Sequence, residues 1–430
     1  MKRAIALSGG GTKGAYELGV WKALLQLDVD YQIVTGTSIG SINGALMAMH
    51  AYEQCVKMWE NLVMEDMMSD GIEVTSKIED FYNQKKALKP FLKKYFKNKG
   101  ADISPFAELV ARMVDERAVR ESSVDYGLVT VQVPSMNPFM LSKKEIPDGL
   151  LSDYILASSA IFPVFPLHKI GEETYIDGCY YDNLPIDLAI SMGATDIVAV
   201  DLHTTPAHPN YAKRPYVKYI KPSRELGGIL DFDHDRILAN AKMGYQDALK
   251  AYGELKGFLY SFTPKSVSKM KKQVERLSVS MAMGESILMR NNQNRIAKAG
   301  DIYRMFHELE EHTDGKTLTK EDYFVRAAEI CGEIFEMDVT QVYDLCEFAR
   351  SMREKIDTPE AYPDAALFAQ SAKRNLFAKL SDLKLQNNSR YITGCLYYAM
   401  QNEAIDYEEQ LGILTYLPHE VAAALFLHAL

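Results

Sequence analysis

Long apolar runs, clustered cysteines and an excess of positive charge are all absent from this chain of 430 residues. No run of about 18 apolar residues occurs, so we expect no membrane-spanning helix. The first apolar run ends at Leu7, short of the roughly 7–15 residues that form the core of a secretory signal. The 5 cysteines show no zinc-ligand spacing and no Cys-x-x-Cys pair, which favours a reduced, cytoplasmic compartment without a metal centre.

The charge balance also argues against one class of partner. The formal net charge is −10 at pH 7, whereas proteins that bind nucleic acid present basic surfaces, so we expect no nucleic-acid partner. Hydrophobic residues make up 47% of the chain and charged residues 25%, which suits a core of ordinary size. The length favours two domains.

A glycine-flanked serine follows the apolar run at residues 31–34, in the stretch Gly36-Thr37-Ser38-Ile39-Gly40. A strand that turns at once into a helix through Gly-x-Ser-x-Gly holds the serine in a strained bend, where flanking side chains would collide. The bend also presents the hydroxyl at a helix N-terminus, where negative charge on an attacked carbonyl oxygen is stabilised. Gly36, Ser38 and Gly40 therefore form a candidate nucleophile elbow.

A second glycine cluster, residues 9–14, follows the apolar run at residues 4–7. Its bare N–H groups predict an oxyanion hole, and the candidate donors are Gly9, Gly10, Gly11, Thr12, Lys13 and Gly14. The rival interpretation is a dinucleotide site, because the cluster satisfies Gly-x-Gly-x-x-Gly. That site also needs an acidic residue at the end of the next strand, and none stands there.

A serine nucleophile needs a base, and Asp177 is the first candidate. It ends a short β-like run and precedes Gly178, which predicts a carboxylate at the same sheet edge as Ser38. A carboxylate with a pKa of roughly 4 is a poor base in bulk water, so Asp177 must be close to Ser38 and shielded. His203 is an alternative base of a Ser-His-Asp esterase, because it follows the β-like run at residues 196–201. A base other than histidine predicts an acid limb of activity below pH about 6.5.

With these motifs in this order, the chain resembles the patatin-like phospholipases, in particular acyl hydrolases of the bacterial type. The resemblance rests on four blocks and extends to about residue 260: the glycine cluster, the elbow with Ser41-Ile42-Asn43-Gly44 behind it, the loop at residues 157–163, and Asp177-Gly178. It implies that Ser38 is the nucleophile and Asp177 the base of a two-residue dyad. One departure is visible, because Cys179 stands where the family usually has glycine or alanine.

The resemblance implies cleavage of a fatty acyl ester of a phospholipid or lysophospholipid through an acyl-enzyme, with a lipid ester as substrate and no metal or organic cofactor. The same site could instead pass the acyl group to an alcohol. A different class also stays open, namely a catalytically weak lipid-binding or scaffolding protein. Residues 85–99, with seven lysines and no acidic residue, predict an amphipathic helix that contacts an anionic membrane peripherally or covers the active-site cleft as a lid.

The predicted fold is α/β, a three-layer sandwich with a central, mostly parallel sheet. β-like runs at residues 3–8, 31–35, 127–133, 174–176 and 196–201 alternate with helical patterns,. We expect residues 1–265 to form the catalytic domain, residues 266–299 a linker or helical connection, and residues 300–430 a smaller all-helical domain of unknown role. The apolar tail at residues 421–430 predicts a helix packed into that domain or against a partner subunit, so the domain could support an oligomer.

Overall fold

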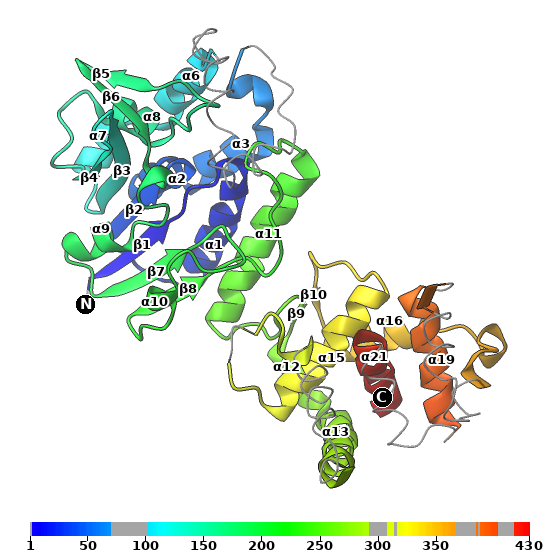
Figure 1. Cartoon of the computed structure of the whole chain (residues 1–430). Helices are drawn as coiled ribbons and strands as arrows, with labels where there is room; N and C mark the ends of the chain where they lie inside the picture. The colour runs from blue at the N-terminus through cyan, green and yellow to red at the C-terminus, as the bar shows by residue number, and fades with distance from the viewer. Residues whose placement is uncertain are drawn as a thin grey trace. The chain divides into compact units, whose positions relative to one another are not determined.

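The computed structural model describes residues 2–69, 102–291, 308–313, 316–366, 384–385, 388–402 and 417–430, without the side chains of 283–291. Contacts divide the chain into two units, Met1–Tyr252 and Gly253–Leu430 (Figure 1). The division therefore falls earlier than the boundary at residue 265 that the sequence suggested. Helix α13 (Lys271–Asn291) occupies most of the expected linker and belongs to the second unit.

The first unit is built on an eight-stranded sheet. Its strands, in spatial order, are β5 (His168–Ile170), β6 (Glu173–Asp177), β3 (Asp125–Val133), β2 (Ile33–Thr37), β1 (Arg3–Leu7), β7 (Asp196–Val200) and β8 (Val217–Ile220), and β4 (Asn137–Ser142) also pairs with β3. The five strands from β3 to β8 run parallel, whereas β4, β5 and β6 are joined by antiparallel pairs. The α/β prediction is confirmed, and each of the five predicted runs forms a strand. The sequence analysis missed β4, β5 and β8.

Helices cover both faces of this sheet (Figure 1). On one face, α9 (Ile186–Ser191) packs on alternate strand residues such as Ala4 and Ala6. On the other face lie α2 (Ile39–Ala48), where a Cβ on Gly44 would touch Val34 and Leu7, and α8 (Leu151–Ser158). This alternation buries both faces of the parallel strands, as an α/β sheet requires.

The first unit has further described helices and 3-10 turns. They are η1 (Gly11–Gly14), α1 (Ala15–Gln26), α3 (Tyr52–Asn61), η2 (Met64–Asp66), α6 (Ser104–Met113), α7 (Glu116–Glu121), η3 (Gly178–Tyr180), α10 (Pro209–Ala212) and α11 (His234–Ala251). Helices α1 and α11 pack so closely that a Cβ on Gly244 would lie 2.0 Å from the carbonyl oxygen of Tyr16. Only glycine permits that approach.

The second unit is largely helical around its own apolar core. Its described elements are β9 (Ser261–Phe262), α12 (Pro264–Lys269), α13, α15 (Lys320–Ile334), β10 (Val342–Tyr343), α16 (Leu345–Glu354), η6 (Pro359–Ala361), α19 (Ser389–Gln401) and α21 (Pro418–Ala429). Thr319 and Asp322 form a capping box at the start of α15. The apolar tail is α21, and Val421 and Phe426 are buried in this core. The unit is not purely helical, because β9 and β10 pair in parallel.

Two predictions concern membranes. The lysine-rich stretch at residues 85–99 lies outside the described residues. Across the described parts of the chain, we find no helix with both the length and the apolar character that crossing a bilayer requires.

Candidate active site

Ser38 lies in a sharp turn between β2 and α2, with backbone angles φ 54° and ψ −124°. A non-glycine residue with positive φ is strained, and such strain is stored where surrounding contacts enforce it. The turn tolerates no Cβ on Gly36, since it would lie 2.0 Å from the carbonyl oxygen of Gly40. A Cβ on Gly40 would lie 2.7 Å from the carbonyl oxygens of Leu7 and Ser8. The geometry is therefore that of a nucleophile elbow.

A second serine holds the elbow in place. The Ser38 N–H donates to the hydroxyl of Ser158, 3.0 Å away, and that hydroxyl donates to the carbonyl of Val129 at 2.6 Å. Ser158 belongs to the loop at residues 157–163 that carried part of the family resemblance, but the sequence analysis assigned it no role. Its function could have been suspected only from a register that places the end of α8 beside β3.

The N–H groups of the glycine cluster are not all free to bind an oxyanion. Gly9 donates to the carbonyl of Asn183 at 2.9 Å, Thr12 to that of Ile229 at 2.9 Å, and Lys13 to that of Gly10 at 3.3 Å. Gly14 lies inside η1 and packs against Ile39.

Two donors of the cluster remain. Within the described ranges, no acceptor is found for the N–H of Gly10 or of Gly11. Both residues line a pocket together with Ser38. Of the six candidates, these two have N–H groups available to a bound oxygen.

Asp177 reaches Ser38 through strand register. Thr37 at the end of β2 pairs with Val129 in the middle of β3, and the next residue, Thr130, pairs with Asp177 of β6. The sequence analysis expected Asp177 at the same sheet edge as Ser38, and in the structure its strand, β6, runs antiparallel to β3. Ser38 and Asp177 lie at the same height along β3, because β2 ends halfway along that strand. Gly178 fits there because a Cβ would lie 2.2 Å from the carbonyl oxygen of Val129.

The carboxyl group of Asp177 is fully buried. Its Oδ1 accepts a hydrogen bond from the Cys179 N–H at 2.8 Å. Although Cys179 departs from the family pattern, its backbone therefore stabilises the turn. Its Oδ2 accepts no hydrogen bond of ordinary geometry from any described residue. Burial raises the pKa of Asp177 to about 6, although the Cys179 N–H and the nearby Ser38 hydroxyl act to lower the pKa. A shielded carboxyl with a raised pKa and a free oxygen is suited to accept a proton.

Ser38 lies where two pockets meet. One, here called the apolar pocket, is lined by side chains that include Ile42, Met58, Trp59, Phe106, Leu109 and Phe165. The other, here called the polar pocket, is lined by Asp177, Lys13, Cys179, Asn183, His203 and Glu225, among others. Both contain Ser38 and Gly10. The arrangement suits an ester with a long apolar chain on one side of its carbonyl and a polar alcohol on the other.

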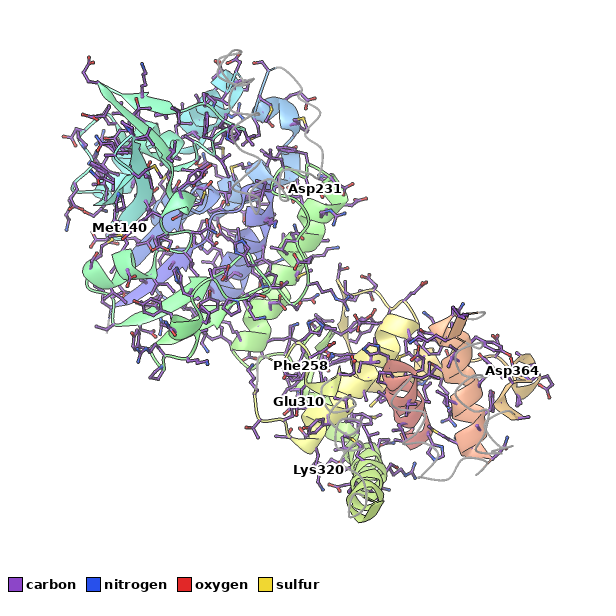
Figure 2. All side chains as sticks on the ribbon, in the orientation of Figure 1. Met140, Asp231, Phe258, Glu310, Lys320 and Asp364 are labelled. Atoms are coloured by element: carbon purple, nitrogen blue, oxygen red, sulfur yellow. The ribbon has the colours of Figure 1, made fainter. Side chains whose placement is uncertain are left out.

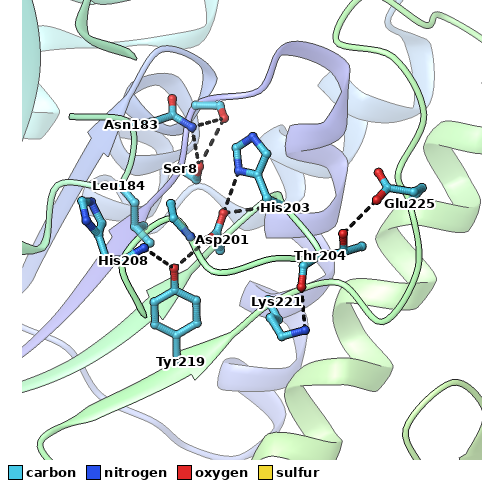
Figure 3. A network of polar contacts seen from close by, with 12 residues as sticks. Ser8, Asn183, Leu184, Asp201, His203, Thr204, His208, Tyr219, Lys221 and Glu225 are labelled. Carbon is cyan, nitrogen blue, oxygen red and sulfur yellow. Dashed lines mark hydrogen bonds and ion pairs between the residues drawn. The ribbon is translucent and has the colours of Figure 1, made fainter. Parts of the chain in front are cut away.

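His203, the alternative base, also lines the polar pocket. Its Nδ1 lies 2.9 Å from Oδ1 of Asp201, which is buried at the end of β7 (Figure 3). No hydrogen bond joins His203 to Ser38 among the described residues. The structure thus brings His203 to the pocket but binds its ring to Asp201.

Further polar side chains that the sequence analysis did not assign fix the glycine cluster. The amide of Asn183 donates to the Ser8 hydroxyl and to the Gly9 carbonyl, both at 3.0 Å (Figure 3). The amide of Asn43 on α2 donates to the Gly14 carbonyl at 3.1 Å and to the buried carboxyl of Glu17 at 2.8 Å. The loop is therefore tied to Asn183 on one side and to the helix behind Ser38 on the other.

The stretch at residues 231–235, which begins like a calcium loop, has structural roles. Asp231, ahead of α11 (Figure 2), lies 2.7 Å from the Arg236 guanidinium, and Asp233 caps α11 by accepting from the Arg236 N–H at 2.8 Å.

Part of the chain is similar to known proteins. Residues 5–190 match the family model described as patatin-like phospholipase. This part of the chain is therefore similar to a patatin-like phospholipase domain. The match covers β1 to α9, and so includes Ser38, Asp177 and the glycine cluster.

Relatives of the patatin-like domain occur within much longer proteins. Patatin-like phospholipase domain-containing protein 7 of Mus musculus is 26% identical over 205 residues, which are 46% of this chain and 13% of that protein. Triacylglycerol lipase 4 of Saccharomyces cerevisiae is 25% identical over 230 residues, 48% of this chain and 25% of that protein. VipD from Legionella pneumophila aligns over 98% of this chain and 91% of its own, at 14% identity and a TM-score of 0.34, too low to support an argument.

Proposed function

We propose that the chain is a serine acyl hydrolase that cleaves fatty acyl esters of phospholipids or lysophospholipids, with Ser38 and Asp177 as a catalytic dyad. The observation that carries this proposal is the position of Ser38. It stands on a strained elbow between an apolar pocket and a polar pocket that holds a buried, ionisable carboxyl group. Relatives described as phospholipase and lipase support lipid esters as the substrate class.

In the proposed reaction, the Ser38 hydroxyl attacks the ester carbonyl and passes its proton to Asp177. The N–H groups of Gly10 and Gly11 donate hydrogen bonds to the developing oxyanion, and the acyl chain occupies the apolar pocket. Asp177 then returns the proton to the departing alcohol, which leaves through the polar pocket. Water attacks the acyl-enzyme by the same route and releases the fatty acid.

A second mechanism is favoured by one observation, the Asp201–His203 pair in the polar pocket. In this alternative, His203 accepts the proton of Ser38 and Asp201 orients the ring. The dyad accounts better for the structure, because Asp177 approaches Ser38 closely enough for the hydroxyl to affect the carboxyl pKa.

Fatty acid release tests the proposal. Purified protein is incubated with phosphatidylcholine and with lysophosphatidylcholine in detergent micelles, and the products are quantified by mass spectrometry. We expect release by the native protein and a loss of at least about 10³-fold in Ser38→Ala. Equal release by Ser38→Ala would show that another group performs the chemistry. No release by the native protein from either lipid would contradict the proposed substrate class.

A further inference from the structure

Three histidines of the first unit are each paired with an aspartate: His203 with Asp201, His208 with Asp182, and His168 with Asp153. Of these three, only His203 belongs to the described residues that line the polar pocket with Ser38. Its side chain is 49% exposed, so the ring is accessible to a molecule entering that pocket. Pairing with aspartate is thus common in this unit, but a paired imidazole beside the nucleophile is particular to His203.

The His203 ring is held in position by Asp201, whose two carboxyl oxygens accept further hydrogen bonds from neighbouring groups. Asp201 is completely buried and accepts hydrogen bonds from the His203 N–H at 3.0 Å and from the Ala207 N–H at 2.7 Å, as well as from the Tyr219 hydroxyl (Figure 3). Burial alone would raise the pKa of Asp201, but the hydrogen bond with the His203 ring and those from the Ala207 N–H and the Tyr219 hydroxyl hold the pKa below its ordinary value. Asp201 is therefore a fixed negative charge that orients the ring through Nδ1.

Among the described residues, the other ring nitrogen, Nε2, has no hydrogen-bond partner, so it is available to a molecule in the pocket. In Figure 3 the ring extends away from Asp201 toward the side where Asn183 lies, and Asn183 lines the same pocket. An imidazole anchored at Nδ1 by a carboxylate donates from Nε2 when it is protonated, and its natural acceptor is an anionic oxygen.

We infer that His203 is a specificity-determining residue that binds the phosphate group of a phospholipid through Nε2, while Asp201 positions the ring. The inference rests on the proposed function, because it concerns the alcohol side of the same ester. In a glycerophospholipid the phosphate lies only a few covalent bonds from the acyl ester. A substrate whose carbonyl is held at Ser38 therefore places its phosphate within the polar pocket.

The other charged groups of the pocket are consistent with a phosphate. Lys13 is nearly buried and adds a positive charge to the lining. Glu225 adds a negative charge, but its side chain is exposed and accepts a hydrogen bond from the Thr204 hydroxyl at 2.8 Å. Water screens the exposed charge of Glu225 more strongly than the nearly buried charge of Lys13. Asp177 also lines the pocket and is fully buried, so Lys13 and a protonated His203 are the groups that attract a phosphate against the negative charge of Asp177.

The test compares two lipids that differ only in the phosphate-bearing head group. Phosphatidylcholine and diacylglycerol with identical acyl chains are offered in the same detergent micelles to the native protein, to His203→Gln and to His208→Gln. The last variant is the matched control, because His208 has the same kind of partner but is absent from the pocket lining. The measured quantity is the ratio of kcat/KM for phosphatidylcholine to kcat/KM for diacylglycerol.

We expect His203→Gln to lower this ratio about 10- to 100-fold, the usual effect of losing a hydrogen bond to a charged group. His208→Gln should keep the native ratio. An unchanged ratio in His203→Gln overturns the inference. Loss of hydrolysis of both lipids by His203→Gln also overturns it, since His203 would then be the base of the second mechanism. If the native protein hydrolyses neither lipid, the proposed function has failed instead.

Discussion

At the scale of single residues, the ionised form of Asp177 is needed for the proposed catalysis but destabilises the folded protein. A buried carboxylate with one unpartnered oxygen is costly, and the cost is visible as a pKa raised to about 6 by burial. The folded state therefore binds the proton more tightly than the unfolded chain does. Stability is complete below the unfolded pKa of about 4 and is lost as the pH rises through about 6.

Replacement of Asp177 by asparagine should consequently stabilise the protein at high pH. A shift of about two pKa units corresponds to roughly 3 kcal/mol. We expect the free energy of unfolding of Asp177→Asn to match that of the native protein near pH 4 and to exceed it by about 3 kcal/mol at pH 8. Urea unfolding at both pH values measures the difference, with the exposed Asp148→Asn as control. A difference that does not grow with pH would contradict the raised pKa.

The same carboxyl should set the acid limb of activity. Because Asp177 must be ionised to accept a proton, kcat/KM should fall as the pH drops through about 6,. The position of the limb alone does not identify the base. The decisive comparison is the pH profile of His203→Gln on a soluble ester. We expect the limb to persist there, and its disappearance would favour His203 as the base.

At the scale of elements, the strands and turns that carry the site could be read from the sequence, but their mutual placement could not. Ser38, the glycine cluster and Asp177 each follow an apolar run, and local patterns of this kind determine strand ends. That β6 is antiparallel follows from its pairing with β5 and β3, which no local pattern encodes. For the same reason Ser158 and Asn183 escaped prediction, since their roles arise from long-range contacts.

Ser158 should act as a positioning residue for the elbow. In Ser158→Ala the Ser38 N–H loses its buried acceptor, and an unsatisfied group of this kind costs about 1–3 kcal/mol. We expect kcat to fall roughly 10-fold while KM changes little. The adjacent Ser159→Ala is the matched control, because the Ser159 hydroxyl is buried without a hydrogen-bond partner in the described structure. Equal rates for both variants would show that the elbow does not depend on Ser158.

At the scale of the whole molecule, the length predicted two domains, with a boundary near residue 265, and the contacts of the structure divide the chain after Tyr252. Leu259, Tyr260 and Phe262 belong to the core of the second unit. The buried carboxyl of Glu329 explains why, since it accepts hydrogen bonds from the N–H groups of Phe258, Leu259 and Tyr260 at 2.6–3.0 Å. Because the resemblance to the patatin-like family extended to about residue 260, the sequence analysis gave no reason to end the first domain at Tyr252.

The position of the boundary makes a prediction about shortened chains. A chain that ends at Tyr252 keeps the whole sheet and both pockets, so it should be soluble and unfold cooperatively,. A chain that ends at residue 265 carries Leu259, Tyr260 and Phe262 without the core that buries them and should aggregate more readily,. Circular dichroism melting and size-exclusion chromatography compare the two. If the chain that ends at residue 265 melts at a higher temperature and aggregates less than the chain that ends at Tyr252, the boundary lies near residue 265.

The central claim is that Ser38 is a nucleophile activated by Asp177. Its most direct test is the mass of the intact protein after treatment with a long-chain fluorophosphonate in detergent micelles. We expect one adduct on the native protein, none on Ser38→Ala, and labelling slowed by about 10²-fold or more in Asp177→Asn. An adduct that persists in Ser38→Ala, or the absence of any adduct on folded native protein, would contradict the claim.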